Sequence, residues 1–300
     1  MLARQYCNTA LILTVVCLSK RRALISIMFK SLMFMLFAFQ IVNVQTTNGS
    51  LGYNQFEATI ETSFQRMVID SPSGSLLVAS INRLYKLSSD LQVEFEKITG
   101  PVADNQACPP PPRSCSVAKT PTNNFNKVLV VDDERHQLIV CGSVYQGTCQ
   151  ILRLEDLNLV ERPSREVVTN TEHGTNVAFI APGTSSGSGS VLYTAASRGM
   201  WLRNVPSVAK RVLRRSLYGV VFVHIPGNTI DETAAGNTFD INYINGFSRG
   251  HFSFFIATQL ENFREVGSPL YTKIVRLCND DVVALGLTLN FLLYARTQME

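Results

Sequence analysis

The chain of 300 residues is poor in charge, has a single tryptophan, and has no long apolar run after its first 44 residues. Charged residues make up 17% of the sequence and hydrophobic residues 46%, so the chain has apolar material for a core and is not of the disordered class. The body, residues 53–281, has no stretch of 18 consecutive apolar residues, and it therefore predicts no transmembrane helix.

Acidic residues are absent from the first 44 residues, which hold five of the 27 basic ones. The rest of the chain therefore has 22 basic and 23 acidic residues, although the formal net charge of the whole is +4. A nucleic-acid-binding domain needs a surplus of Lys and Arg to face phosphates. The sequence thus predicts no nucleic-acid partner.

Motifs for catalysis, metals and cofactors are also missing. The four histidines are scattered, with no H-E-x-x-H or paired metal spacing. Gly183–Ser190 is rich in glycine but lacks the lysine of a phosphate-binding loop, and Asp132–Glu134 is typical of a solvated turn. We therefore expect a chain that is not an enzyme and that holds no metal or cofactor.

Two short apolar runs lie near the N-terminus, at residues 10–18 and 31–42, and Lys20-Arg21-Arg22 separates them. As a helix, twelve residues rise about 18 Å, short of a hydrocarbon core of about 30 Å. Basic residues before a short apolar run are typical of a secretory signal. Residues 1–46 are therefore predicted to form a hydrophobic signal helix, either a signal peptide or a signal anchor spanning roughly residues 23–44.

Either interpretation sends the body into the secretory pathway, to the cell surface or the extracellular space. The sequon Asn48-Gly49-Ser50 fits this compartment and makes Asn48 a candidate glycosylation site.

Five cysteines lie beyond the N-terminal segment, and four of them form two close pairs. Six residues separate Cys108 from Cys115, and seven separate Cys141 from Cys149. In an oxidising compartment such pairs close as local disulfides, whereas a four-cysteine zinc site would use tighter spacing. We predict two disulfides, with the zinc site as the alternative. Cys278 is then expected to be unpaired or to have lost its partner.

The body is predicted to consist of short strands joined by turns. Residues 127–131 and 137–142, for example, form a hairpin with the polar loop 132–136. A strand, a turn of small residues and a returning strand recur at intervals of 62, 53 and 60 residues. The repeats start at Leu76, Leu138, Val191 and His251. This period is typical of β-propeller blades, and an all-β sandwich is the alternative.

One basic cluster lies in the body. Its members are Arg198, Arg203, Lys210, Arg211, Arg214 and Arg215. Two interpretations stay open: a solvated loop between blades, or an exposed surface that contacts a protein ligand or heparan sulfate.

Several stretches resemble the sema domain of plexins, the cell-surface receptors for semaphorins. The most specific is Cys141–Gln150 (CGSVYQGTCQ), followed by Arg153–Leu157 (RLEDL). The others, in chain order, are residues 81–87 (INRLYKL), 99–108, 123–129 (NNFNKVL), 239–247 and 274–281. No single motif is specific, but their order is, and the resemblance covers about residues 53–281.

The resemblance implies an all-β, sema-type β-propeller with about four of the family's seven blades. It also implies an extracellular module that binds a semaphorin by protein–protein contact in cell and axon guidance. The protein would reach the membrane only through a retained N-terminal anchor or a missing C-terminal part.

The resemblance ends at Asp281, and residues 282–300 are expected to be a divergent apolar tail of a truncated product. The family partner of Cys278 would then lie in the missing part. Three alternatives to a receptor stay open: a semaphorin-type ligand, an extracellular propeller hydrolase, and a nonfunctional truncated product. The hydrolase would need paired carboxylates facing a central channel.

Overall fold

The computed structural model describes most of the body. The described residues are 54–58, 62–111, 113–163, 165–182, 190–197, 205, 207–216, 219–230, 241–260, 267–279 and 295–296. The predicted signal helix, Asn48 and nearly all of the predicted tail lie outside these ranges. Within them, no helix is both long and apolar enough to cross a membrane.

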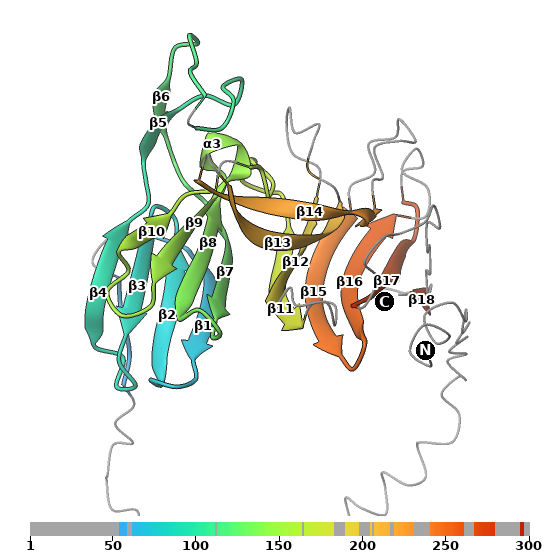
Figure 1. Cartoon of the computed structure of the whole chain (residues 1–300), viewed down its shortest axis with the longest axis horizontal. Coiled ribbons are helices and arrows are strands. Elements are labelled where there is room, and N and C mark those ends of the chain that lie inside the picture. Colours follow the sequence, from blue (N-terminus) through green and yellow to red (C-terminus); the bar gives the residue numbers. More distant parts are fainter. Residues whose placement is uncertain are drawn as a thin grey trace, which may run out of the picture. The chain divides into compact units, whose positions relative to one another are not determined.

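Four antiparallel sheets of four strands follow one another along the chain (Figure 1). The first has β1 (Phe64–Asp70), β2 (Ser75–Ser80), β3 (Arg83–Leu87) and β4 (Val93–Ile98). The second has β7 (Asn126–Asp132), β8 (Gln137–Gly142), β9 (Cys149–Arg153) and β10 (Leu159–Glu161). The third has β11 (Asn176–Pro182), β12 (Ser190–Ala196), β13 (Val208–Ser216) and β14 (Gly219–Ile230). The fourth has β15 (Ile241–Arg249), β16 (Phe252–Leu260), β17 (Leu270–Cys278) and β18 (Ala295–Arg296).

Strands that are neighbours in sequence pair within each sheet, which is the meander of a propeller blade. The first strands of the sheets contact one another in turn, β1 with β7, β7 with β11, and β11 with β15. Between the first and second sheets, an extra hairpin joins β5 (Val102–Asp104) to β6 (Thr120–Thr122). A one-turn helix, α3 (Val144–Gly147), connects β8 to β9.

The apolar runs of the sequence reflect sheets that are buried on both faces. On β8, Leu138 and Val140 belong to the core between the first two sheets, while Ile139 and Cys141 belong to the core between the second and third. Successive side chains of a strand point to opposite faces, so a strand with a core on each side needs an uninterrupted apolar sequence.

The third and fourth sheets pack through aromatic rings. The ring of Phe179 stacks on Tyr193 with centroids 5.5 Å apart and lies 5.2 Å from Phe255. Gly246 leaves room for this packing, because a Cβ atom there would lie 2.6 Å from the Phe179 ring.

The predicted repeat is confirmed. The second strands of the four sheets, β2, β8, β12 and β16, begin within one residue of the four repeat starts. The predicted hairpin is also present, with β7 paired to β8 across the loop 133–136. The alternative of an all-β sandwich is wrong, because successive four-stranded sheets pack side by side through their first strands.

Candidate functional site: the loops at the hairpin end

The first two sheets present two different sets of connections at their two ends. One end, here called the hairpin end, has the β2–β3 turn, the β5–β6 hairpin, residues 123–125, α3 and residues 162–170 (Figure 1). The other, here called the turn end, has the tight turns 71–74, 133–136 and 154–158. Loops carried by a rigid scaffold are where binding residues concentrate, so the longer connections of the hairpin end are the candidate site.

Asn82 ties the first sheet to the second at the hairpin end. Its backbone φ is 65°, in the left-handed region that asparagine tolerates well. Its side chain donates to Asn123 Oδ1 at 2.9 Å and accepts from the Asn124 amide at 2.7 Å. Its carbonyl accepts from the Thr99 amide at 2.8 Å. The β2–β3 turn therefore holds the chain segment that enters β7.

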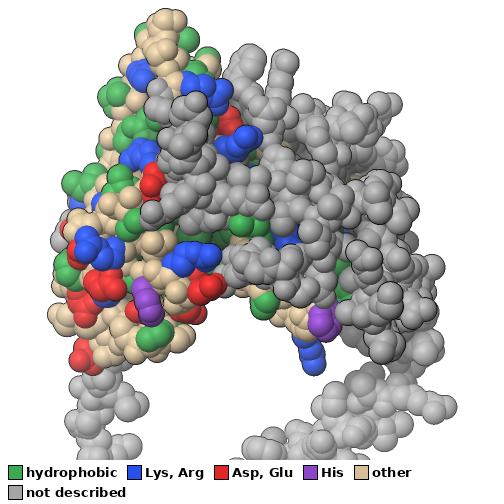
Figure 2. All heavy atoms as spheres, in the orientation of Figure 1, with side chains coloured by type: hydrophobic (Ala, Val, Ile, Leu, Met, Phe, Trp, Pro, Cys, Tyr) green, Lys and Arg blue, Asp and Glu red, His purple; other side chains and the backbone are tan. Residues whose placement is uncertain are grey.

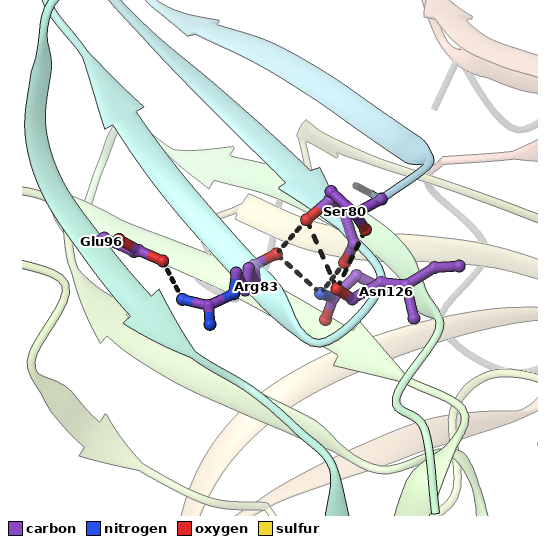
Figure 3. Close-up of polar contacts among 6 residues, drawn as sticks. Ser80, Arg83, Glu96 and Asn126 are labelled. Carbon is purple, nitrogen blue, oxygen red and sulfur yellow. Dashed lines mark hydrogen bonds and ion pairs between the residues drawn. The ribbon is translucent and has the colours of Figure 1, made fainter. Parts of the chain in front are cut away.

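Asn126 is a second link between these sheets (Figure 3). It is fully buried, and its Nδ2 donates to the carbonyls of Ser80 and Arg83 at 2.7 and 3.1 Å. The same nitrogen donates to Thr99 Oγ1 at 3.1 Å. Figure 3 also shows the Arg83 side chain turned away from Asn126 to an ion pair with Glu96 on β4. Asn126 thus satisfies polar groups that the β2–β3 turn leaves inside the interface.

A pocket of about 650 Å³ opens beside Asn82. Residues before β1, the β2–β3 turn, Gly100-Pro101 and Asn123 line it. A Cβ atom on Gly100 would lie 2.3 Å from Asn82 Oδ1, so glycine is needed at the pocket wall. Thr62, Ser63, Asn82 and Asn123 are polar members of the lining, which suits the hydrogen bonding of a polar ligand group.

The β8–β9 connection has an unusual backbone. Tyr145 and Gln146 have φ values of 53° and 64°, and Gly147 follows at 76°. Left-handed conformations of residues other than glycine cost free energy and persist only when neighbouring contacts enforce them. Here the Tyr145 amide donates to Asp104 Oδ2 at 2.6 Å, and Gln146 Oε1 accepts from Asn170 Nδ2 at 2.9 Å.

Both predicted disulfides are present. Cys141 and Cys149 lie opposite each other on β8 and β9, with Cα atoms 3.9 Å apart, and close the base of the left-handed turn. Cys108 and Cys115 close a loop within the β5–β6 hairpin, with Cα atoms 5.4 Å apart. Both bonds therefore stabilise connections of the hairpin end, and they exclude the four-cysteine zinc site.

The prediction for Cys278 is wrong. Cys278 is disulfide-bonded, and its partner lies outside the described residues. The other four cysteines beyond the N-terminal segment pair with one another, so spacing gave no partner for Cys278.

For two members of the basic cluster, Lys210 and Arg211, the interpretations as an exposed surface and as a solvated loop are both wrong. Lys210 and Arg211 lie on β13 with exposed fractions of 0% and 1%. Lys210 Nζ donates to the Asn279 carbonyl, and Arg211 Nε donates to Thr194 Oγ1 at 3.1 Å. Burial lowers the pKa of Arg211 to about 10. Arg198, Arg203 and the side chains of Arg214 and Arg215 lie outside the described part.

Two further basic residues, Arg66 and Lys127, join the first three sheets and were missed by the sequence argument. Arg66 donates to the carbonyls of Lys127 and Asn176 at 2.9 and 3.2 Å, and Lys127 Nζ donates to the Gly174 carbonyl at 3.1 Å. Burial, followed by the charge of Arg66, lowers the pKa of Lys127 to about 8.

Exposed charges differ between the two ends. Figure 2 shows Lys and Arg side chains near the β5–β6 hairpin and a mixture rich in Asp and Glu toward the turn end. The Arg113 side chain is 63% exposed, and its guanidinium lies 3.8 Å from the Glu166 carboxylate. The Arg162 guanidinium lies over the Tyr145 ring, 5.5 Å from its centroid.

In the described ranges, no group of three or more His, Cys, Asp or Glu residues could hold a metal ion.

No protein-family model matches the chain. It is 32% identical over 259 residues to plexin-A2 of Mus musculus, covering 78% of this chain and 14% of that protein. It is 34% identical over 240 residues to plexin-A4 of Homo sapiens, covering 73% of this chain and 12% of that protein. The chain therefore spans about an eighth of the length of these relatives.

The fold of the chain is also similar to a solved structure of the plexin A4 full extracellular region, domains 1 to 8. It matches with a TM-score of 0.62 and 30% identity, covering 79% of this chain and 27% of that chain. Sequence and fold together identify the chain as a homologue of the plexin extracellular region, with the all-β blades of a sema-type propeller.

Proposed function

We propose that the chain is the ligand-binding part of a plexin-like receptor at the cell surface and that it binds a semaphorin-type protein. The observation that carries this proposal is the homology to A-type plexins, at about a third identity over most of the chain. We place the binding domain at residues 53–281, after an N-terminal secretory segment at residues 1–46 and before a tail at residues 282–300.

The described residues support binding rather than chemistry. The connections of the hairpin end are fixed by two disulfides and by hydrogen bonds between the sheets, so they present a shape that needs little ordering on binding. A protein ligand would bury on the order of 1,600 Å² in such a complex. The resulting receptor would act in cell guidance by binding and not by turnover of a substrate.

The test is direct binding of the secreted full chain to a panel of semaphorin ectodomains by biolayer interferometry. We expect at least one to bind with a dissociation constant of about 1 μM or tighter. Excess free chain should compete with the immobilised chain for that ligand. A folded, monodisperse chain that binds no semaphorin in the panel would contradict the proposal.

A further inference from the structure

The first sheet has an exposed apolar face on the side away from the second sheet. Val68 and Leu84 pack in the core between these two sheets, so the side chains that alternate with them on β1 and β3 point the other way. We call this side the leading face. Its large apolar residues that are at least 51% exposed are Phe64, Met67 and Ile69 on β1 and Val93 and Ile98 on β4.

Contacts with their neighbours place these residues on the leading face. Val93 and Ile98 pair with residues of β3 that alternate with Leu84, and paired residues share a face. The Phe64 ring lies 5.9 Å from the ring of Phe56, which packs on the middle of the same face. Among the described strands, no further sheet covers this side. Contiguous exposed apolar residues of this kind mark an interaction site.

The equivalent positions of the second sheet are buried. Met67 and Ile69 are the fourth and sixth residues of β1. The fourth and sixth residues of β7 are Leu129 and Val131, and they pack against the first sheet. Leu129 is 7% exposed, whereas Met67 is 75% exposed. The leading face therefore has the apolar pattern of a face that another sheet of this fold covers.

The fourth sheet has an apolar face at the other end of the series. Phe255 packs against the third sheet, so Phe252, Phe254 and Ile256 on the same strand point to the opposite side. Phe247 pairs with Phe254, and their rings stack with centroids 5.3 Å apart. We call this side the trailing face. Its four apolar side chains are half-buried or exposed.

We propose that two copies of the chain associate head to tail, with the trailing face of each copy packed on the leading face of the other. The contact repeats the junctions inside the chain, where β1 contacts β7, β7 contacts β11 and β11 contacts β15. An apolar partner fits the leading face, because Arg83 and Glu96 on that face pair with each other.

Two such contacts join the four sheets of one copy to the four of the other. A ring of eight sheets is within the range of closed propellers, and a head-to-tail interface that closes gives an assembly of fixed size. The proposal goes beyond semaphorin binding and does not depend on it.

The test is sedimentation velocity of the full chain at concentrations from about 1 to 100 μM. One variant, Met67→Lys, places a charge on the leading face, and another, Phe247→Lys, places one on the trailing face. The matched control is Leu159→Lys, on the second sheet. All three side chains are exposed, so each variant should fold. Circular dichroism and thermal midpoints establish that they do.

We expect the wild-type chain and Leu159→Lys to form dimers with a dissociation constant of about 10 μM or tighter. Added NaCl should not weaken these dimers, because the contact is apolar. Met67→Lys and Phe247→Lys should each dimerise about tenfold more weakly, because each buries an unpaired charge. An equimolar mixture of these two variants should associate more tightly than either alone, because one of its two contacts has both faces intact.

Four results would overturn the proposal. They are a wild-type monomer at about 100 μM, assemblies that grow beyond two copies, equal weakening by Leu159→Lys, and wild-type dimerisation of Phe247→Lys. The last would show that two leading faces pack on each other.

Discussion

The two ends of the first two sheets are built in different ways. At the turn end, hydrogen bonds close the turns 71–74 and 133–136 on themselves: the Gly74 amide donates to the Asp70 carbonyl at 2.8 Å, and Arg135 pairs with Asp132 at 2.9 Å. One contact there joins the two sheets, since Lys86 Nζ donates to the Glu155 carbonyl at 3.3 Å. At the hairpin end, the partners are far apart in sequence. Tyr145 and Asp104 are separated by 41 residues, as are Asn82 and Asn123.

This difference has a consequence for stability. A turn that is closed by its own residues can open without disturbing the neighbouring sheet. The contacts of the hairpin end join two sheets, so they should break only when the sheets separate. Substitutions at the hairpin end are therefore expected to lower the free energy of global unfolding, whereas equivalent changes at the turn end should have small local effects.

The largest effect is expected from Asn126→Leu. This change removes the three hydrogen bonds that Asn126 donates and the one that it accepts from Asn124, and it leaves the Ser80 and Arg83 carbonyls without their buried donor. It should cost about 3 kcal/mol of unfolding free energy. The matched change at the turn end is Asn158→Ala, which removes the exposed hydrogen bond from Asn158 Nδ2 to Asp156 and should cost about 0.5 kcal/mol or less. Urea unfolding measures both losses of unfolding free energy. Equal losses would contradict the claim that the hairpin end contributes more to global stability than the turn end.

The next effect is expected from replacing Cys141 and Cys149 together by alanine. The chain-entropy estimate for so short a loop is about 2–3 kcal/mol. The Cys108–Cys115 loop is of similar length, so this estimate alone predicts a similar loss for its removal. We expect the Cys141–Cys149 variant to lose more, because both of its sulfur-bearing residues are fully buried between sheets. If the Cys141–Cys149 variant loses no more unfolding free energy than the Cys108–Cys115 variant, the burial of Cys141 and Cys149 adds nothing to stability.

A smaller effect is expected from Asp104→Asn. The substitution keeps the shape of the side chain but removes the charge that strengthens the bond to the Tyr145 amide, at a cost of about 1–2 kcal/mol. Asp132→Asn is the control at the turn end, where the half-exposed Arg135 is the partner, and it should cost about 0.5–1 kcal/mol. A greater loss of unfolding free energy in Asp132→Asn than in Asp104→Asn would contradict the larger contribution that we assign to the hairpin end.

The smallest effect is a pH dependence from Lys127. Its pKa is about 8 in the folded chain, against 10.5 for an ordinary lysine. Between these values the unfolded chain binds the proton that the folded chain has lost, so stability increases as pH rises through this window. The cost of burying the charge is fully present below about pH 8. Relative to Lys127→Met, the wild-type chain should therefore gain stability from pH 7 to pH 10 in urea unfolding, and a constant difference would contradict the shifted pKa.

Local features of this chain could be predicted from sequence. Residues 127–131 and 137–142 appear as strands because their apolar side chains face cores on both sides, and the polar loop between them closes on itself. The two disulfides could be predicted for the same reason, since each joins cysteines that are close in sequence.

The contacts between sheets could not be predicted in this way. The only signal of the Asn126 link is an asparagine at the start of an apolar strand, and nothing local indicates its partners on β2 and β3. The burial of Lys210 and Arg211 on β13 could not be predicted either, because charge alone predicts exposure. The carbonyl of Asn279 and the hydroxyl of Thr194, which allow Lys210 and Arg211 to be buried, are distant in sequence.

Native-state hydrogen exchange tests the difference between the ends most directly. The Tyr145 and Asn124 amides should exchange only with a free energy close to that of global unfolding, because their acceptors lie on distant segments. The Gly74 and Arg135 amides of the turn end should exchange through local opening, at a much lower free energy. Two results would contradict this account: the same free energy of exchange for all four amides, or better protection of the turn-end amides. Either would show that the contacts of the hairpin end do not depend on global unfolding.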